Sequence, residues 1–309
     1  MNAGAKLAAY GLVLAGMIGG GAAIGATVGP IETGARGAEH GGGHAGDGPE
    51  ATPATRDLPA GGLLVSQDGY TFDPATRILD AGRTNRFSFT IATPEGRPLT
   101  AYERLHDREL HLIVVSNDLA QFHHVHPTRD ERGTWSIDLP PLQPGAHRAY
   151  ADFQPRHGDQ LTLGVNVTVP GLVPAPTKVT ERHTVEVDNY QVTLSGDPQP
   201  GVDSEVTITV RRDGAVVTTE PYLGAAGHLV AIRDGDLAYL HVHPLDDVPA
   251  GPVRFAVEVP SAGTYGMYFD FSVDGIVRTA AFTTVIDAGP DPSDDAEPSS
   301  APAAGHNGH

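Results

Sequence analysis

The sequence of 309 residues contains no cysteine, which excludes disulfide bonds, thiolate catalysis and thiolate metal ligands. Basic residues are scarce, with 20 Lys and Arg against 38 Asp and Glu, for a formal net charge of −18. A nucleic-acid backbone is therefore not an expected partner, because it must be neutralised by clustered basic side chains. Serine-triad, P-loop and dinucleotide-binding signatures are also absent. Metal chemistry in this chain must use oxygen ligands or its 15 histidines.

One long apolar run lies near the N-terminus, where residues 7–28 carry no charge. A helix of this length can cross a bilayer core of about 30 Å. Lys6 precedes the run and acidic residues follow it closely, so the positive-inside rule places the rest of the chain outside the cytoplasm. We expect residues 1–31 to be a single-pass anchor in the cell membrane. A cleaved signal peptide, which would leave a secreted protein, is the alternative.

Two segments lack any periodicity and are rich in Gly, Pro, Ala or Ser, which is typical of flexible chain. We interpret residues 32–60 as a His/Gly-rich linker and residues 288–309 as a disordered acidic tail. Each contains a histidine pair, His40/His44 and His306/His309. These histidines are expected to be solvated spacer residues, although they could collect metal ions loosely.

The rest of the chain contains two copies of one unit, shown best by HDRELHLIVVSNDLAQFHHVHP at 106–127 and LGAAGHLVAIRDGDLAYLHVHP at 223–244. The two segments align without a gap, so that three histidines and a proline coincide. Further downstream, both copies have an Asp before a Phe, at Asp152 and Asp270. The repeat predicts two homologous domains, residues 61–171 and 178–287, joined by a Pro-containing linker at 172–177.

Short runs of alternating apolar and polar residues, separated by Gly, Pro, Asp and Asn, characterise both copies. About 110 residues of short strands per copy is typical of a β-sandwich. The predicted fold is therefore all-β: tandem immunoglobulin-like β-sandwiches after a single N-terminal transmembrane helix.

The histidines are predicted to converge on one face of a hairpin in each copy. Asp234-Gly235 is typical of a two-residue type I′ turn, which would set His228 directly opposite His241. By the same register, a turn at Asn117-Asp118 would set His111 opposite His124. A further histidine two residues along the strand returns to that face. We therefore expect two metal sites with these ligands: His111, His124 and His126 in the first copy, and His228, His241 and His243 in the second.

Other polar residues are weaker candidates. Asp152 and Asp270 are expected to supply a fourth oxygen ligand, to orient an imidazole, or to have a structural role at a strand end. His123 should lie on the opposite strand face, and His106 has no matching histidine in the second copy. His147, His157 and His183 follow no recurring pattern and are expected to be surface residues.

The segments LHDRELHLIVVSNDLAQFHHVHP and YLGAAGHLVAIRDGDLAYLHVHP resemble bacterial envelope proteins described as heavy-metal-binding domain proteins. They are more loosely similar to small secreted β-sandwiches associated with copper handling. The resemblance covers both repeats and the apolar segment. It implies an anchored exterior protein with metal-binding sandwich domains, and it favours copper without excluding zinc.

Three functions follow from these observations. The first is an extracytoplasmic metal-binding protein, with one Cu or Zn ion in each sandwich, that buffers or sequesters metal or passes it to an envelope acceptor protein. The second is a non-catalytic envelope interaction module in which the histidines are structural. The third, an enzyme that activates water on the metal, is disfavoured because no general base recurs beside the histidines.

Overall fold

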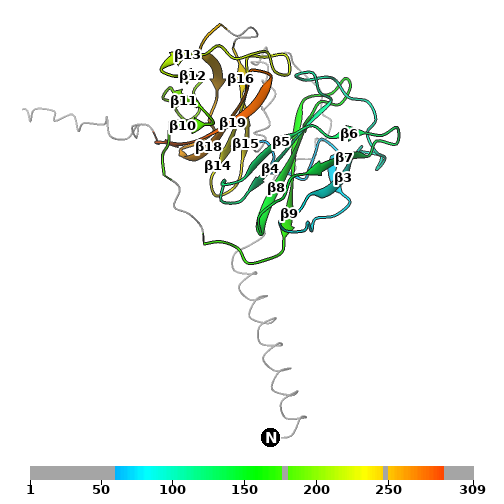
Figure 1. The fold of residues 1–309 in the computed structure, drawn as a ribbon. Coiled ribbons are helices and arrows are strands. Elements are labelled where there is room, and N and C mark those ends of the chain that lie inside the picture. Colours follow the sequence, from blue (N-terminus) through cyan, green and yellow to red (C-terminus); the bar gives the residue numbers. More distant parts are fainter. Residues whose placement is uncertain (1–59, 176–179, 246–249, 289–309) are drawn as a thin grey trace, which may run out of the picture. The chain divides into compact units, whose positions relative to one another are not determined.

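The computed structural model describes residues 60–175, 180–245 and 250–288, except for the side chains of His241 and His243 (Figure 1). All its regular elements are β-strands, as predicted. The expected anchor at 1–31 and the expected tail at 288–309 lie outside this part, apart from residue 288. In the described ranges, no helix has the length and apolarity that a bilayer span requires.

Strands β1 to β9 form two sheets, with strand orders β1-β2-β3-β7-β6 and β5-β4-β8-β9. We call this part the first sandwich. Its strands are β1 (Ser66–Gln67), β2 (Tyr70–Pro74), β3 (Asn85–Ala92), β4 (Leu110–Ser116), β5 (Phe122–Val125), β6 (Thr128–Arg129), β7 (Trp135–Leu139), β8 (Gly145–Phe153) and β9 (Leu161–Val169).

Strands β10 to β19 repeat the arrangement, with orders β10-β11-β12-β17-β16 and β15-β14-β18-β19, and form the second sandwich. Its strands are β10 (Thr184–Val187), β11 (Tyr190–Ser195), β12 (Ser204–Arg212), β13 (Ala215–Val216), β14 (His228–Arg233), β15 (Tyr239–His241), β16 (His243–Pro244), β17 (Val253–Val257), β18 (Gly263–Val273) and β19 (Ile276–Ile286).

Each sandwich has its own hydrophobic core between its two sheets. Alternate residues of the strands point inward, as in β3, where Phe87, Phe89 and Ile91 are buried while the residues between them are not. In the second sandwich, Ile208 and Phe269 belong to the corresponding core. The period of two in the sequence therefore encodes the inward face of these strands.

The central hairpin of each copy has a different register from the predicted one. Ile113, not His111, is paired with His124, and Val230, not His228, is paired with His241. The turn is longer than expected, because the backbone N–H of Ser116 donates to the carbonyl of Gln121 and leaves four residues between them.

Aspartate side chains stabilise these longer turns. In the first copy, Asp118 Oδ1 accepts from the Ala120 N–H at 3.2 Å, and in the second, Asp236 Oδ1 accepts from the Ala238 N–H at 3.1 Å. Leu119 and Leu237, which directly follow these aspartates, adopt positive φ. The register thus differs by two residues from the prediction, and an even shift leaves every side chain on its predicted face.

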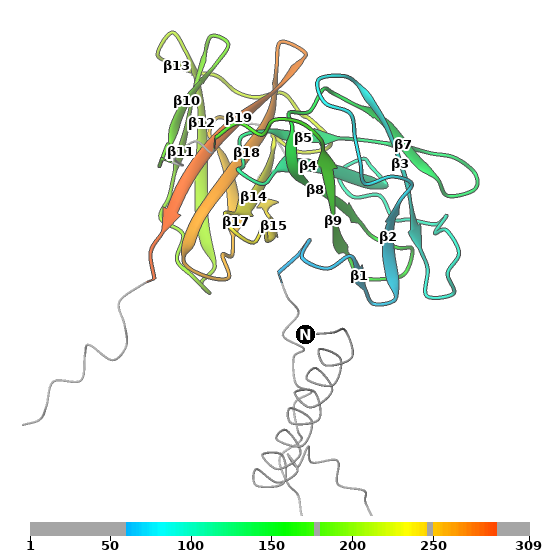
Figure 2. The same cartoon turned by 90° about the horizontal axis from the view of Figure 1, so that it is seen from below.

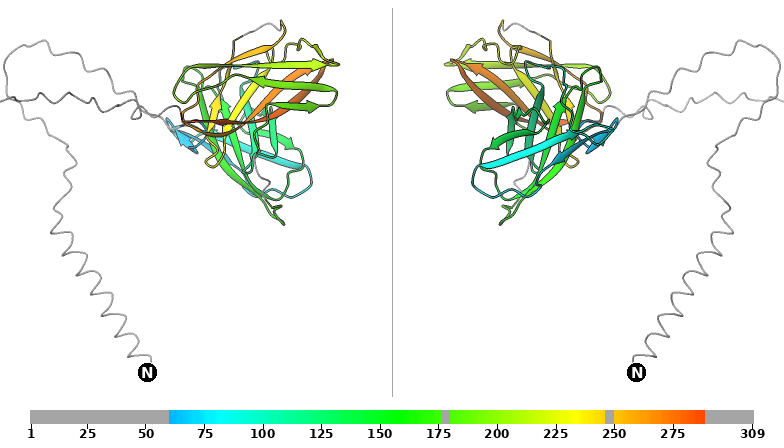
Figure 3. Two further views of the ribbon diagram at one scale, coloured as in Figure 1. Left: turned by 90° about the vertical axis from the view of Figure 1, so that its left-hand side faces the viewer. Right: turned by 90° about the vertical axis from the view of Figure 1, so that its right-hand side faces the viewer.

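The two sandwiches pack against each other through the outer faces of sheets β5-β4-β8-β9 and β15-β14-β18-β19 (Figure 2). Ile113 and Val115 of β4 share a buried cluster with Val230 and Ile232 of β14. Figure 3 shows the blue and cyan strands of the first sandwich on one side of the orange strands of the second. Outer faces that would be polar in an isolated sandwich are apolar here, because each covers the other.

Reciprocal contacts show that this interface has pseudo-twofold symmetry. The Tyr150 hydroxyl donates to the Leu237 carbonyl at 2.7 Å, and the Tyr268 hydroxyl donates to the Leu119 carbonyl at 2.6 Å. The rings of Phe122 and Tyr268 stack with their centroids 4.0 Å apart. The repeat in the sequence is therefore a pair of domains that bury the same surface against each other.

Candidate metal centre

Three histidines of the first sandwich converge at the edge of this interface. His111 lies at the start of β4, His124 in β5, and His126 where the chain passes from β5 to β6 in the opposite sheet. His111 Nδ1 is 3.0 Å from His124 Nε2 and 3.2 Å from His126 Nε2. All three nitrogens lie within 4.8 Å of one another. The structure thus brings together the three ligands predicted in this copy, although their register differs.

The second nitrogen of two of these rings has a partner that fixes its tautomer. His111 Nε2 lies 3.0 Å from the Leu105 carbonyl, which can only accept, so we place the proton on Nε2. His124 Nδ1 lies 2.7 Å from Asp270 Oδ2, so we place its proton on Nδ1. Backbone carbonyls and carboxylates orient metal-ligating histidines in this same way.

These tautomers direct two lone pairs at each other. Once Leu105 and Asp270 have taken the ring protons, His111 Nδ1 and His124 Nε2 are both acceptors, and they are 3.0 Å apart. His126 Nε2 can donate one proton to one of them and leaves the other unsatisfied. A cation bound by the three nitrogens would satisfy every lone pair in the cluster. The arrangement is therefore chemically suited to hold a metal ion.

Asp270 reaches this cluster from the other sandwich. It lies in β18, opposite His228 of β14, and its side chain is buried together with that of His124. Its second oxygen accepts a hydrogen bond from the Thr279 hydroxyl at 2.5 Å. Of the three roles considered for this aspartate, the structure supports orientation of an imidazole. Sequence reasoning did not indicate that the imidazole would belong to the other copy.

Burial lowers the pKa of two of these imidazoles, His111 and His126, because a charged ring loses solvation. Burial, reinforced by the neighbouring His124, lowers the pKa of His111 to about 4. Burial, with repulsion from His124, His111 and Arg108, lowers the pKa of His126 to about 2. The rings of His111 and His126 are thus neutral at physiological pH, the state in which imidazole binds metal.

The second copy has the same local arrangement around His228. Its Nε2 lies 2.9 Å from the Tyr222 carbonyl, as His111 Nε2 does from that of Leu105, and burial lowers its pKa to about 4. The backbones of His241 and His243 pair with Val230 and Ala256, in different sheets. Their side chains lie outside the described part, so their role as ligands remains a prediction.

Because His111 and His228 have lowered pKa values, we expect the chain to lose stability on acidification in a buffer containing a chelator. An unfolded histidine has a pKa of about 6.5, so the unfolded chain takes up protons between about pH 6.5 and 4 while the folded chain does not. The stabilisation is complete above pH 6.5 and is lost toward pH 4. Calorimetry from pH 7.5 to 4.5 should show a falling Tm, with a smaller fall in a His111→Leu/His228→Leu variant. Identical slopes in the two proteins would contradict this assignment.

The other histidines occupy varied positions. His157 is exposed and His183 is partly exposed, in line with the prediction that they are surface residues. The same prediction for His147 is wrong, because this histidine is only 1% exposed. Ala149 of β8 belongs to the core of the first sandwich. His147 lies two residues away in the same strand and therefore also points inward. His123 is on that face too, opposite Val114, as expected.

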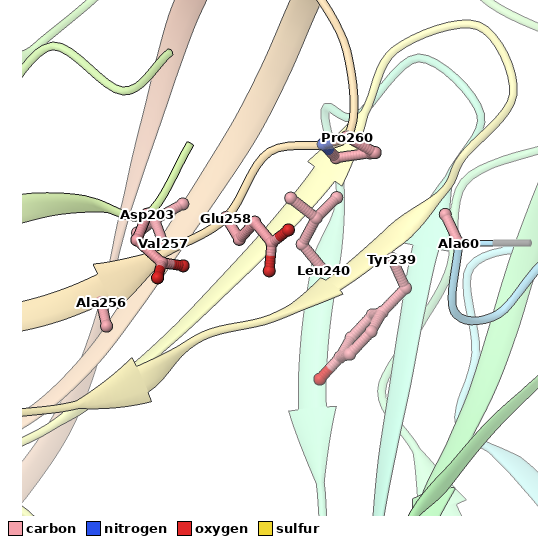
Figure 4. A pocket seen from close by; sticks show the side chains of 8 residues that line it. All are labelled: Ala60, Asp203, Tyr239, Leu240, Ala256, Val257, Glu258 and Pro260. Carbon is pink, nitrogen blue, oxygen red and sulfur yellow. The ribbon is translucent and has the colours of Figure 1, made fainter. Parts of the chain in front are cut away.

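Two cavities adjoin the sandwich interface. The smaller, about 20 Å³, is lined by His106, His111, His124, Asp152 and His228, together with Leu229 and Val230 of β14, Tyr239 of β15 and Val242. The larger, about 340 Å³, lies beside Ala60 and contains the carboxylates of Asp203 and Glu258 (Figure 4). None of the residues that line the larger cavity is a histidine. The imidazoles therefore surround a space of about one water molecule rather than a substrate cleft.

Comparisons with known proteins give only remote similarity. The Escherichia coli adhesin FdeC is 14% identical over 72% of this chain and 65% of its own, with a TM-score of 0.25. A Salmonella alpha-2-macroglobulin mutant is 14% identical over 74% of this chain and 16% of its own, with a TM-score of 0.26. This chain spans less than two thirds of either protein. No curated protein matches.

One family model matches the chain twice, at residues 65–171 and 185–288. The first match covers every residue of strands β1 to β9. The second begins at the second residue of β10 and extends past the end of β19. Together they span well over half of the sequence. The chain therefore belongs to the family described as Domain of unknown function (DUF8832), with one copy of the domain in each sandwich.

Proposed function

We propose that this protein binds copper or zinc outside the cytoplasm, with one ion in each sandwich, to buffer or sequester the metal or pass it to an acceptor protein of the envelope. The ligands of the first ion are His111, His124 and His126. The observation that carries the proposal is the 3.0 Å distance between His111 Nδ1 and His124 Nε2, two nitrogens that the assigned tautomers both make acceptors.

The nitrogen spacings suit such an ion. Three nitrogens about 2.0 to 2.1 Å from one tetrahedral ion lie about 3.3 to 3.4 Å from one another. The two distances from His111 Nδ1, 3.0 and 3.2 Å, need to expand only slightly. Three imidazoles are ligands accepted by both Zn(II) and Cu(II), so the ligand set does not choose between them. The preference for copper rests on the sequence resemblance.

The small cavity favours binding over catalysis. About 20 Å³ accommodates an ion or a single water molecule but no organic substrate. A fourth ligand on the first ion can come from water or from an acceptor protein, which suits a site that exchanges its metal. Membrane attachment through residues 7–28 would keep such a protein near envelope transport proteins, and this part of the proposal rests on the sequence alone.

The second ion is proposed from the repeat. His228 has the same place in its strand as His111 and the same carbonyl partner geometry. His241 and His243 follow it at the same spacing as His124 and His126 follow His111. We therefore assign His228, His241 and His243 as its ligands.

Metal content is the direct test. The parent protein should carry alanine at His40, His44, His306 and His309, so that the terminal segments contribute no imidazole. After exposure to equimolar copper and zinc and then desalting, mass spectrometry should find about two equivalents of one metal, and a His124→Ala/His126→Ala variant should retain one fewer. Retained metal that does not change in this variant, with altered folding or partner capture instead, would support the interaction module.

A further inference from the structure

Two equivalent turns hold the first histidine of each copy. In residues 105–108 and 222–225, the first and last residues exchange backbone hydrogen bonds of 2.8 to 3.2 Å. The carbonyl of the first residue, Leu105 or Tyr222, accepts from Nε2 of His111 or His228. Both turns therefore leave the Nδ1 lone pair of their histidine available to an ion.

These turns lie side by side across the sandwich interface. A Cβ atom built on Gly224 would be 3.5 Å from Asp107 Oδ2. The second residue of each turn has a left-handed backbone, with φ of 48° at His106 and 50° at Leu223. The copies thus share the turn conformation and differ in the side chain that it presents.

That difference places an imidazole of the first sandwich against the second. The ring centroid of His106 is 4.9 Å from that of His228 but 6.1 Å from that of His111. Within the trio of the first site, the centroids are 4.9 to 5.2 Å apart. His106 and His228 therefore have the spacing of two imidazoles that can share an ion, and both line the small cavity.

We propose that His106 is a ligand of the second metal ion, so that this ion is bound by residues of both sandwiches. The inference rests on the proposed function and deepens it. Only His106 and His228 are placed by the structure, and His241 and His243 come from the proposed function. Together they would give the second ion four imidazoles and a closed coordination sphere, whereas the first would have three and an open position. The second ion is then retained and links the sandwiches, and the first is the one exchanged.

The test replaces His106 by leucine in the parent protein without terminal histidines. Leucine is the native residue at the equivalent, equally left-handed position 223, so the turn is expected to keep its conformation. His106→Asn serves as a second variant, because asparagine tolerates positive φ. His183→Leu, at a partly exposed position of the second sandwich, is the matched control.

Cobalt(II) titration provides the readout, because the intensity of its visible absorption reports coordination number. We expect two bound equivalents in the parent and in His183→Leu. In both His106 variants, one equivalent should bind at least about 10-fold more weakly and change its visible spectrum, because water takes the place of an imidazole, while the other is unchanged. Two equivalents with unchanged affinity and spectra in both variants would overturn this assignment and leave the proposed function intact. A parent that binds no cobalt, copper or zinc would overturn the proposed function itself.

Discussion

Replacing Asp270 by asparagine is expected to weaken metal binding at the proposed first site by about 10- to 100-fold, although the three histidines of that site belong to the other sandwich. Asp270 Oδ2 accepts the Nδ1 proton of His124 at 2.7 Å and so directs the Nε2 lone pair toward the proposed ion position beside His111. An asparagine amide can turn its NH₂ group toward the ring, which moves the ring proton to Nε2 and blocks the ligand. The lost charge also makes the imidazole a weaker donor to the metal.

A competition titration of Zn(II) against a chromophoric chelator measures this effect. Asp274→Asn is the matched control, because Asp274 lies in the turn after β18, is exposed and pairs with Arg212 at 3.0 Å. Its positive φ is compatible with asparagine. We expect unchanged affinity in the control. Equal losses in the two variants, or no loss in Asp270→Asn, would show that Asp270 does not position His124.

Replacing Tyr268 by alanine should produce the largest loss of stability, because this side chain joins the two sandwiches. Tyr268 is 3% exposed, stacks on Phe122 and donates a hydrogen bond to the Leu119 carbonyl. Truncation of a buried aromatic residue costs about 3 to 5 kcal/mol. At about 2 to 4 °C for each kcal/mol, we expect a decrease of at least about 6 °C in Tm.

Calorimetry in a chelator-containing buffer checks this prediction. Tyr268→Phe keeps the stacked ring and loses only a hydrogen bond, about 1 kcal/mol, so its Tm should fall much less. Tyr268 lies two residues from Asp270 on the same face of β18, so Tyr268→Ala should also weaken metal binding at the proposed first site. Phe255→Ala, in the core of the second sandwich, should destabilise the chain without that effect on metal affinity. Equal metal affinities in the two alanine variants would show that packing at the sandwich interface does not influence metal binding at the first site.

Much of the first site could be predicted because it depends on local features. The spacing of His111, His124 and His126 recurs in the second copy, and the period of two in strands assigns His111 and His124 to one face. The predicted pairing of His111 with His124 was wrong, because the Asp-Gly signal was interpreted as a two-residue turn. The side chains of Asp118 and Asp236 stabilise a turn of four residues instead. The histidines still lie on the predicted face because the register differs from the predicted one by an even number of residues.

The sequence by itself determined the all-β class, the repeat and the histidines that share a face, because each of these follows from strand periodicity or from comparison of the two copies. Only the tertiary structure decided that Asp270 orients His124, 146 residues away, and that His106 lies against His228. These contacts arise when the apolar outer faces of two sheets pack together. Such packing depends on surfaces assembled from several strands, and no spacing within one segment records which residues it will bring into contact.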